Sequence, residues 1–384
     1  MSYHREPAPR MEQLRLCFVG PCDSVTFRRW IEWFARRGHD VTALTVEPAH
    51  PTPTAFRQVD LTASAGPRKL GRVFSAARLS GMVTRLRPDI VHVHYARGLA
   101  WGLLPARPHP LVVTPWGSDV LEEQGAFKEW YSKLLTTRLL RSADLVTVHS
   151  AYMEQRMRSL LPATASVTRI GWGVDLKMFR PGLDTQDLRK QWGLRPSDRV
   201  IFSPRIAQPF YRLDVVVKAL ARVIATIKDA VLVISEQRAD RNYVEQLRRE
   251  AQEGGVADRV MFAGTIPYED MPRWYNLADA VVMIPRSDGM PNTLLESMAC
   301  GAVPVLSRLP QYAELIRHQQ NGFIVDPEPE EVAGALVEAL AAGVKPSMAE
   351  WNRRLVSDVA DQDVEMTRMQ QRYLELAHAG RAHN

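Results

Sequence analysis

The sequence contains little cysteine: Cys17, Cys22 and Cys300 are the only three in 384 residues. Three cysteines cannot form a disulfide framework, and their spacing does not match a zinc-finger pattern. We therefore expect a reducing, cytosolic setting. The sequence also has no run of about 18 or more apolar residues, which argues against a membrane-spanning helix. Its polar start, MSYHREPAPRMEQ, lacks the apolar stretch of a signal peptide.

Two nucleotide-binding motifs are missing as well. No G-x-G-x-x-G follows the first expected strand, which argues against a dinucleotide-dependent oxidoreductase. No G-x-x-x-x-G-K-[ST] occurs, which argues against a P-loop NTPase. A D-x-D motif, Asp361 to Asp363, is present, but it falls in a helical stretch away from any expected strand end. We therefore expect no metal ion and no other cofactor.

The composition is that of a globular protein with a large core. Hydrophobic residues make up 46% and charged residues 24% of the chain, and its length suits two domains. Short apolar runs alternate with amphipathic helical stretches, which predicts parallel sheets covered by helices. The expected strands are 14–20, 41–46, 89–95, 111–117, 143–150, 199–205, 230–235, 260–264, 280–285 and 303–307.

This alternation occurs in two series, which predicts an α/β protein with two Rossmann-like, doubly wound domains. We expect an N-terminal domain over residues 1–180 and a C-terminal domain over 181–364, split near Pro181. The stretch 348–379 is helical with no strand after it, and we expect about 365–384 to pack back on the first domain. The Pro-, Ala- and Arg-rich segment 48–70 is typical of a mobile loop.

Positive charge is concentrated in the first half of the chain. Residues 1–180 carry 25 Lys and Arg against 15 Asp and Glu, while the whole chain has a net charge of +6. This excess indicates an anionic partner or simply an Arg-rich surface. The basic residues do not alternate with aromatic ones as in a nucleic-acid platform, so we expect no nucleic acid.

The segment 68–87 is the most basic part of that half. Apolar residues separate its six basic ones, so it could lie as an amphipathic helix on an anionic membrane; the alternative is a solvated helix of the N-terminal domain. A cytoplasmic protein, peripheral on the inner face of the membrane, is the corresponding expectation. The six are Arg68, Lys69, Arg72, Arg78, Arg85 and Arg87.

The segment 287–305, SDGMPNTLLESMACGAVPV, follows an expected strand and begins a helix. Ligands of open α/β sheets bind at the carboxyl ends of the strands, and a helix N-terminus favours an anion there. Glu296, about one turn into the helix, suits ribose hydroxyls, and Asp288, in the loop, suits those of a second sugar. A diphosphate between two sugars describes a nucleotide-sugar. The alternative is an ordinary strand, loop and helix with two solvated acids.

The same segment resembles the E-x7-E signature of family 4 glycosyltransferases, retaining enzymes of the GT-B fold. Four further segments resemble the family in the same order: IGWGVDLKMFRP (170–181), SPRIAQPFYRLDVVVKAL (203–220), AGTIPYEDMPRWYNLADAVVMIP (263–285) and NGFIVDPEPEEVAGAL (321–336). The resemblance spans nearly the whole chain. It implies two domains facing a cleft and the metal-independent transfer of a hexose from a nucleotide-diphosphate sugar, with a UDP-sugar favoured.

Three departures from the family pattern concern the site. Asp288 is shorter than the family's glutamate, which leaves the donor sugar open. Trp116, in VVTPWGSD, replaces the family's histidine. The lysine that usually follows the family's arginine is missing, and Tyr211 and Arg212 occupy its place.

The resemblance implies a role for each residue type at the site. Arg205 and Arg212 would stabilise the leaving diphosphate, Glu296 would hold the ribose, and Asp288 the transferred sugar. The other expected donor-binding residues are Tyr211, Ile266, Gly289, Met290, Pro291, Asn292, Thr293 and Leu294, and the acceptor-side candidates are His94, Trp116, Ser118 and Asp119.

Other interpretations of the same residues stay open. The acceptor is a glycan, a lipid-linked sugar or a small molecule. An inactive GT-B homologue acting as a binding subunit, or a nucleotide-sugar 2-epimerase, are the rival functions. The alternation of a strand predicts that His92 and His94 point to opposite faces, as core or cleft-edge histidines rather than a metal pair. Cys300 is expected to be a small packed residue at a helix end.

Overall fold

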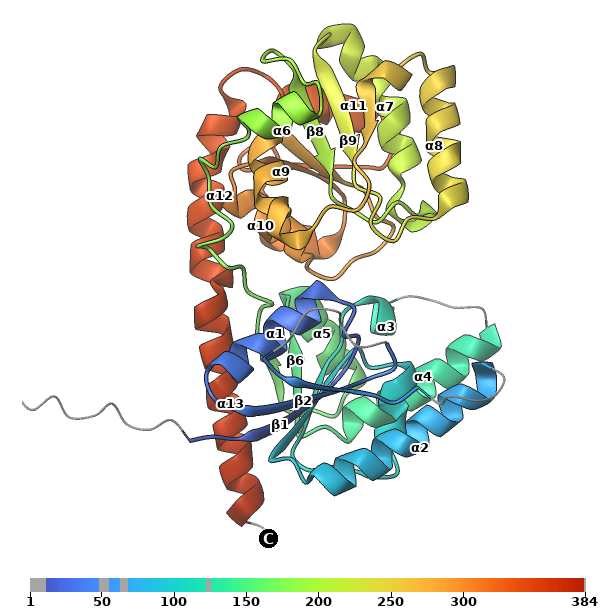
Figure 1. Cartoon of the computed structure of the whole chain (residues 1–384), viewed down its shortest axis with the longest axis vertical. Helices are drawn as coiled ribbons and strands as arrows, with labels where there is room; N and C mark the ends of the chain where they lie inside the picture. The colour runs from blue at the N-terminus through green and yellow to red at the C-terminus, as the bar shows by residue number, and fades with distance from the viewer. Residues whose placement is uncertain (1–11, 48–54, 63–67, 122–125, 383–384) are drawn as a thin grey trace, which may run out of the picture. The chain divides into compact units, whose positions relative to one another are not determined.

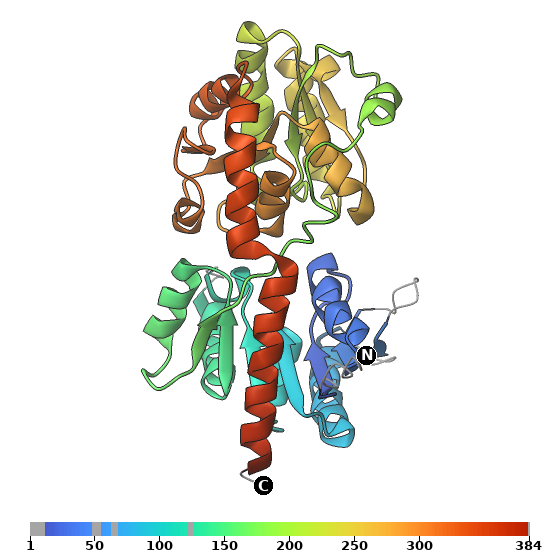
Figure 2. The same cartoon turned by 90° about the vertical axis from the view of Figure 1, so that its left-hand side faces the viewer.

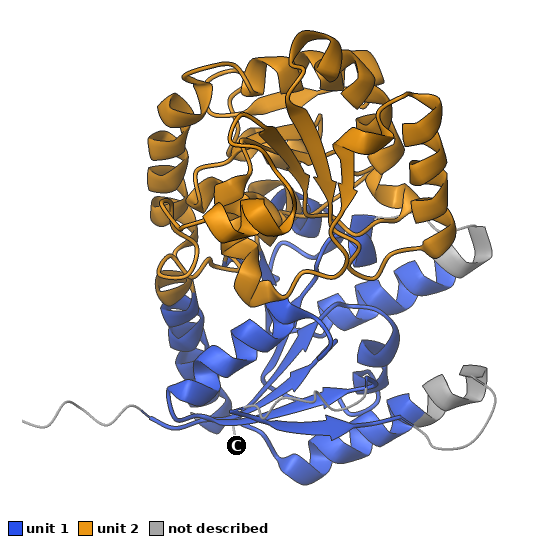
Figure 3. Ribbon diagram, turned by 45° about the horizontal axis from the view of Figure 1, so that its top comes forward, with its two compact units in different colours: residues 1–148, 154–170, 366–384 blue, residues 149–153, 171–365 orange. Residues whose placement is uncertain are grey.

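The computed structural model of the chain describes residues 12–47, 55–62, 68–121 and 126–382. The chain divides into two compact units, which Figure 3 shows in blue and orange. The first unit holds residues 1–148, 154–170 and 366–384, and the second holds 149–153 and 171–365. The main passage from the first unit to the second, at residues 170–171, comes ahead of Pro181, where the sequence places the boundary.

The first unit is built on a parallel sheet whose described strands follow the order β3-β2-β1-β4-β5-β6-β7. These strands are β1 Arg15–Val19, β2 Asp40–Thr45, β3 Arg57–Asp60, β4 Ile90–His94, β5 Leu111–Thr114, β6 Leu145–Val148 and β7 Val167–Arg169. Helices cover both faces (Figure 1): α1 Val25–Arg36, α2 Arg68–Leu86, α3 Ser118–Leu121, α4 Ala126–Arg141 and α5 Ala151–Leu160, with the 3-10 turn η1 Gly98–Leu103. The central strands β4 and β5 are buried on both faces because each lies between two helical layers.

Helix α1 shows how the sequence sets one of these elements. Ser24 precedes the helix, and its Oγ accepts a hydrogen bond from Phe27 N at 3.5 Å, the arrangement of an N-cap. Trp30, Ile31 and Phe34 follow at helical spacing and are buried. The helix that the spacing predicts is therefore confirmed.

The second unit is built on a parallel sheet with the described order β10-β9-β8-β11-β12-β13. The strands are β8 Arg199–Ser203, β9 Ala230–Ile234, β10 Val260–Phe262, β11 Ala280–Met283, β12 Val303–Ser307 and β13 Phe323–Val325. One face is covered by α7 Leu213–Thr226, α8 Arg241–Glu253 and α11 Pro329–Ala339. The other is covered by α9 Met271–Leu277, α10 Asn292–Ala299 and α12 Val344–Ala360, with α6 Gln186–Gln191 on the same side in Figure 1.

In each sheet the strand order reverses once. The reversal lies between β1 and β4 in the first unit and between β8 and β11 in the second. The two loops that leave neighbouring strands at such a point turn in opposite directions and open a crevice at the carboxyl edge. The fold therefore places one candidate ligand site at this edge of each sheet.

Three helices, α11, α12 and α13, follow the last strand of the described chain. Helix α12 ends at Ala360, and α13 Gln362–Ala382 begins after Asp361. From residue 366 onward α13 belongs to the first unit, where Figure 2 shows it in red along the sheet. Its Tyr373 is buried against Phe34, with the hydroxyl on His92 Nδ1 at 2.5 Å. The expected return of the C-terminal helix to the first domain is what the structure shows.

Three short strands depart from the sequence-based expectations. β3 lies inside the segment expected to be a mobile loop, where it pairs with β2 in parallel register; residues 48–54 and 63–67 of that segment lie outside the described residues. β7 and β13 were not expected. All three have only three or four residues, too few for a clear apolar run or alternation.

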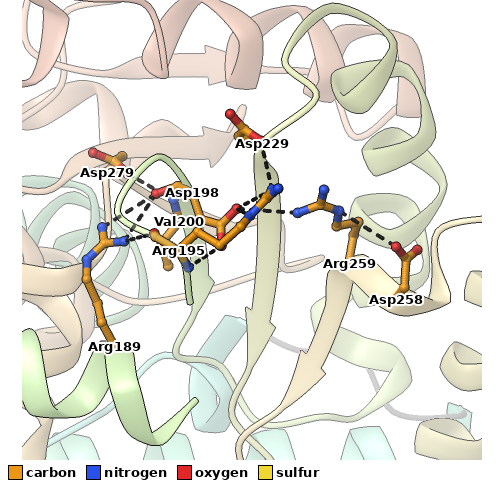
Figure 4. A network of polar contacts seen from close by, with 8 residues as sticks. All are labelled: Arg189, Arg195, Asp198, Val200, Asp229, Asp258, Arg259 and Asp279. Atoms are coloured by element: carbon orange, nitrogen blue, oxygen red, sulfur yellow. Dashed lines mark hydrogen bonds and ion pairs between the residues drawn. The ribbon is translucent and has the colours of Figure 1, made fainter. Parts of the chain in front are cut away.

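The amino edge of the second sheet carries a polar network, shown in Figure 4. Asp198, Asp229, Arg259 and Asp279 each come directly before a strand. Asp198 Oδ1 lies 2.7 Å from Arg195 Nη2 and 3.3 Å from Arg259 Nη1. Asp279 Oδ2 accepts a hydrogen bond from Val200 N at 2.9 Å. The network closes the ends of the strands opposite to the edge where a ligand is expected.

Candidate active site

The loops after β8 and β11 meet at the point where the order of the second sheet reverses. Arg205 comes after β8, and Asp288 comes after β11, ahead of helix α10. A backbone hydrogen bond joins the two loops, from Arg286 N to the carbonyl of Phe210 at 3.1 Å. The predicted site residues of the C-terminal domain are thus held together by adjoining strands.

Arg205 is the buried cation of this crevice, with a side chain 12% exposed. Its Nη2 lies 2.9 Å from Asp288 Oδ2, and its Nη1 donates to Thr293 Oγ1 at 3.1 Å. The guanidinium carbon lies 4.6 Å from the centre of the Tyr211 ring. Burial by itself lowers the pKa of Arg205, but the charge of Asp288 together with Tyr211 and Tyr312 outweighs it and raises the pKa above its ordinary value. A guanidinium has five N–H donors, so donors remain for an anionic ligand.

Asp288 is held from three sides. Its Oδ2 takes the contact from Arg205 and a hydrogen bond from Tyr312 Oη at 3.0 Å, and its Oδ1 accepts from Gly289 N at 2.9 Å. Burial raises the pKa of Asp288 above its ordinary value, and the charge of Arg205 and the Tyr312 hydrogen bond offset only part of that. The side chain is 14% exposed, so the alternative of a solvated acid is wrong here.

Glu296 is the second acid, on helix α10. The residue is 3% exposed, and its Oε1 accepts a hydrogen bond from Tyr268 Oη at 2.8 Å. Tyr268 belongs to the 3-10 turn η4 Tyr268–Asp270, which follows β10. Glu296 is therefore a buried, tyrosine-bonded carboxylate rather than a solvated one, and its contact with a ribose stays a prediction.

Helix α10 begins at Asn292, within the segment 287–305 where the sequence predicts a helix start. Pro291 precedes the helix, and Thr293 brings its hydroxyl to Arg205. The amide of Leu294 donates to the carbonyl of Pro291 at 3.1 Å, so this N–H is already used. The remaining donor-side candidates, Ile266, Gly289 and Met290, are buried, and Asn292 is half-buried.

Tyr211 and Arg212, at the place of the missing lysine, differ in what they contact. Tyr211 packs against Arg205, whereas Arg212 directly precedes α7, which lies on the opposite face of the sheet from α10. Arg212 has a left-handed backbone with a φ of 51°. Burial lowers the pKa of Arg212, and the nearby charge of Arg286 lowers it further.

The acceptor-side candidates lie at the carboxyl ends of β4 and β5 in the first unit. Trp116 and Ser118 are half-buried, and the Trp116 ring meets the His94 ring edge-on with 6.4 Å between centroids. Asp119 is 1% exposed and accepts hydrogen bonds from Ala96 N at 2.7 Å and from the amides of Trp116 and Gly117, each at 2.9 Å. Asp119 thus joins the loops after β4 and β5.

His92 and His94 correct one expectation. Their rings are 4.3 Å apart on the same face of β4, because residues two apart in a strand share a face; the prediction of opposite faces was wrong. Both are 1% exposed, and burial lowers the pKa of His94 to about 3. They are core histidines, as expected.

Cysteine and metal chemistry find little support in the described part of the chain. All three cysteines are buried free thiols, with Cys300 at the end of α10 as expected, and burial raises the pKa of Cys300 to about 12. Within the ranges that the structure describes, no group of three or more His, Cys, Asp or Glu side chains could hold a metal ion. Asp361 and Asp363 lie at the junction of α12 and α13.

The expected membrane contact at 68–87 stays a prediction. Residues 68–86 form helix α2, but the side chains of 68–74 lie outside the described residues. Arg78 Nη1 donates to the carbonyl of Thr62 at 2.8 Å, while Arg85 and Arg87 are exposed. Over the described ranges no single helix is long and apolar enough to cross a membrane; α11 and α12 together meet that test by length and composition but are bent by 92°.

Sequence reasoning missed the residues that support the acids. Tyr312 and Gln311 come from the 3-10 turn η5 Pro310–Glu314 after β12, and Tyr268 comes from the turn after β10. Gln311 Nε2 donates to the carbonyl of Asp288. These residues belong to loops of other strands, and no local motif marks them.

Two Rossmann-like units, with a cation and two acids where the second sheet reverses its order, define the class of the protein. Residues 184–354 match the family model described as glycosyl transferases group 1, and residues 24–173 match that of a glycosyl transferase 4-like domain. The chain belongs to the family 4 glycosyltransferases.

Curated relatives carry related names. The chain is 29% identical over 231 residues to a GDP-mannose-dependent alpha-(1-6)-phosphatidylinositol monomannoside mannosyltransferase of Mycolicibacterium smegmatis, which covers 58% of each protein. It is 27% identical over 223 residues to a D-inositol 3-phosphate glycosyltransferase of Acidothermus cellulolyticus, covering 56% of this chain and 47% of the relative. The match thus spans about half to three fifths of these relatives.

Solved structures share the fold. Sucrose-phosphate synthase from Thermosynechococcus elongatus has a TM-score of 0.81 at 19% identity, covering 96% of this chain and all of the other. HepE of Anabaena, solved with UDP and glucose, has a TM-score of 0.79 at 17% identity, covering 95% and 100%. These likenesses show the two-domain GT-B fold.

Proposed function

We propose that the protein transfers a hexose from a nucleotide-diphosphate sugar to a hydroxyl of its acceptor, with retention of configuration. The observation that carries the proposal is the buried Arg205. Its guanidinium is held by Asp288 and by Thr293, which lies at the start of helix α10. A buried guanidinium with spare donors beside a helix N-terminus favours a diphosphate. Family membership supports the same chemistry.

Asp288 has room for one sugar hydroxyl. A carboxylate offers about four lone-pair sites, two on each oxygen. The Oδ2 contacts of Arg205 and Tyr312 use two of them, and Gly289 N uses one on Oδ1. We infer that the remaining Oδ1 site accepts one hydroxyl of the transferred sugar, and that Glu296 accepts from the ribose.

In the proposed reaction the bond between the sugar's anomeric carbon and the β-phosphate oxygen breaks as the acceptor oxygen approaches from the same face. The new glycosidic bond forms at that carbon, and the acceptor's proton passes to the leaving diphosphate. The protein supplies position and charge in this scheme rather than a nucleophile. Arg205 stabilises the charge that grows on the diphosphate, with Arg212 as the second candidate cation.

Two nucleotide bases, uracil and guanine, are candidates for the donor. A UDP-sugar is the expectation from the sequence, and the Anabaena neighbour is solved with UDP. The mycobacterial-type relative is named for GDP-mannose. The acceptors in the relatives' names contain inositol, so we propose a polyol or sugar hydroxyl, free or lipid-linked, as the acceptor class.

Calorimetric titration of UDP, GDP and ADP into the protein, without added metal, tests the donor site and its base. We expect one diphosphate to bind, and we expect Glu296→Gln to weaken it about tenfold, because a hydrogen bond from a hydroxyl to a charged group is replaced. A Glu296→Gln variant with full affinity and turnover would contradict the ribose contact.

The matching sugar donor, incubated with inositol, inositol 3-phosphate and hexose acceptors, then tests transfer. A glycosylated product supports the proposal. Binding without transfer or hydrolysis would favour a binding subunit, and an isomerised donor without a glycosylated product would favour an epimerase.

A further inference from the structure

Tyr312 is a fully buried tyrosine whose hydroxyl reaches into the donor crevice. It lies in η5, after β12, and has 0% exposure. Its Oη donates to Asp288 Oδ2 at 3.0 Å, and this is the carboxylate oxygen that also meets Arg205 Nη2 at 2.9 Å. The preceding residue, Gln311, donates from its amide to the Asp288 carbonyl. The turn after β12 therefore donates hydrogen bonds to both the side chain and the backbone of Asp288.

These contacts form a continuous series. Tyr312 holds Asp288, Asp288 holds Nη2 of Arg205, and Nη1 of Arg205 rests on Thr293 Oγ1 at 3.1 Å. Three loops, after β8, β11 and β12, are joined in this way. The two terminal nitrogens of Arg205 are fixed, so the direction in which its remaining N–H donors point is fixed as well.

We propose that Tyr312 is a positioning residue of the donor site, which aims Arg205 at the diphosphate through Asp288. This inference rests on the proposed function, in which Arg205 binds the diphosphate. A planar guanidinium binds a phosphate well only when its fork is aligned, so holding it in advance removes an ordering cost. Without Tyr312, the Gly289 amide would be the one remaining group besides Arg205 in the hydrogen bonds described for the Asp288 carboxylate, so the direction that Asp288 gives Arg205 would be less fixed.

Packing alone does not explain the hydroxyl of Tyr312. Tyr275 belongs to the same apolar cluster and is equally buried, yet its hydroxyl has no hydrogen-bond partner in the part of the chain that the structure describes. The core thus accommodates a tyrosine ring whose oxygen makes no hydrogen bond. The oxygen of Tyr312, in contrast, meets a charged group of the crevice.

Tyr312→Phe tests the proposal, since it keeps the ring and removes only the hydroxyl. The matched control is Tyr243→Phe: Tyr243 is 4% exposed and donates to the carboxylate Asp214 at 2.6 Å in the same unit. Each variant is titrated with the diphosphate that the parent binds among UDP, GDP and ADP, and its thermal unfolding midpoint is recorded. We expect about tenfold weaker binding for Tyr312→Phe, the usual size of a lost hydrogen bond to a charged group, and unchanged binding for Tyr243→Phe.

Two further measurements separate positioning from general loosening. In an Asp288→Asn background, Tyr312→Phe should cost much less affinity, because its effect passes through that carboxylate. The Tyr312 hydrogen bond lowers the pKa of Asp288, so in Tyr312→Phe the acidic limb of the affinity–pH profile should move to higher pH.

Each outcome decides a different point. A parent that binds a diphosphate while Tyr312→Phe binds it equally well or better overturns the inference and leaves the proposed function standing. An equal loss in the Asp288→Asn background, or an equal loss in Tyr243→Phe, overturns it too. A parent that binds no diphosphate overturns both.

Discussion

At the amino edge of the second sheet, Asp198 precedes β8 and is buried between Arg195 and Arg259, whereas at the carboxyl edge Asp288 follows β11 and is buried against Arg205. The arginines differ most. The Arg195 side chain is 52% exposed and that of Arg205 is 12% exposed. Residues of the same two types thus form a solvent-facing network at one edge (Figure 4) and an enclosed pair at the other.

The two aspartates respond to this difference in opposite directions. Burial raises the pKa of Asp198, but hydrogen bonds from Arg195 and the charges of Arg195 and Arg259 outweigh it, so the pKa is lowered. Burial also raises the pKa of Asp288, and there Arg205 and Tyr312 do not fully offset it. Asp198 is a satisfied structural acid. Asp288 is a buried acid whose pKa stays raised even beside a cation, a combination typical of functional sites.

Removing the arginine at each edge should separate the two roles most strongly. Arg205→Ala removes the buried cation, and we expect turnover to fall by about 10²–10³ because one preorganised charge contact to the transition state is lost. Arg195→Ala removes a largely exposed partner and should change the free energy of unfolding only slightly. Transfer assays and urea denaturation on both variants measure this contrast. Comparable losses of turnover in the two variants would contradict the assignment of a functional role to Arg205 and a structural role to Arg195.

The aspartates should give opposite pH dependences of stability. The raised pKa of Asp288 means that the folded protein binds this proton more tightly than the unfolded chain does, so ionising it as pH rises costs stability. As pH rises from acid to neutral, the free energy of unfolding of Asp288→Asn should therefore increase relative to that of the parent. The lowered pKa of Asp198 has the reverse sign. Its ionised form contributes stability above the ordinary carboxyl pKa, and this contribution is lost as pH falls through the lowered value.

Urea denaturation at several pH values measures both. Asp198→Asn should lose about 1–3 kcal/mol near neutrality, the usual range for a hydrogen-bonded charged group, and the loss should shrink in acid. If the difference in free energy of unfolding from the parent changed with pH in the same direction for both variants, the opposite pKa shifts of Asp198 and Asp288 would be contradicted.

Much of the fold could be predicted because the central strands are short apolar runs between helices, as in 199–205 and 280–285. Two of the three missed strands lacked this signal: β3 reads RQVD and β7 reads VTR. The third, β13, reads FIV, which is apolar but only three residues long. The amino edges of both sheets carry a sequence signal that could have been used. An aspartate directly precedes β4, β6 and β11, and in each case its Oδ2 accepts a hydrogen bond from a backbone amide of a neighbouring strand, at 2.7–2.9 Å.

The candidate site was predictable as far as single segments extend. One strand, loop and helix contains both Asp288 and Glu296, and the family resemblance pointed to Arg205, which the fold places after the adjoining strand β8. Tyr268 and Tyr312 could not be found in this way, because each reaches an acid from the loop of a different strand. The burial of the acids was equally out of reach, since it depends on how these loops pack.

The smallest expected effect concerns the backbone at the two edges. Arg212, at the carboxyl edge, has a φ of 51°, and Gly193, on the amino side ahead of β8, has a φ of 63°. A left-handed conformation costs a residue other than glycine about 1 kcal/mol. Arg212→Gly should therefore raise the free energy of unfolding by up to about 1 kcal/mol, and Gly193→Ala, with open space around the added Cβ, should lower it by a similar amount. Arg212→Ala removes the same guanidinium but keeps the strained backbone, so any loss of diphosphate affinity shared by both Arg212 variants belongs to the side chain. Such a shared loss would mean that the carboxyl edge retains a strained arginine for its charge, whereas parent-like affinity in both would remove Arg212 from the proposed site and leave Arg205 as its cation.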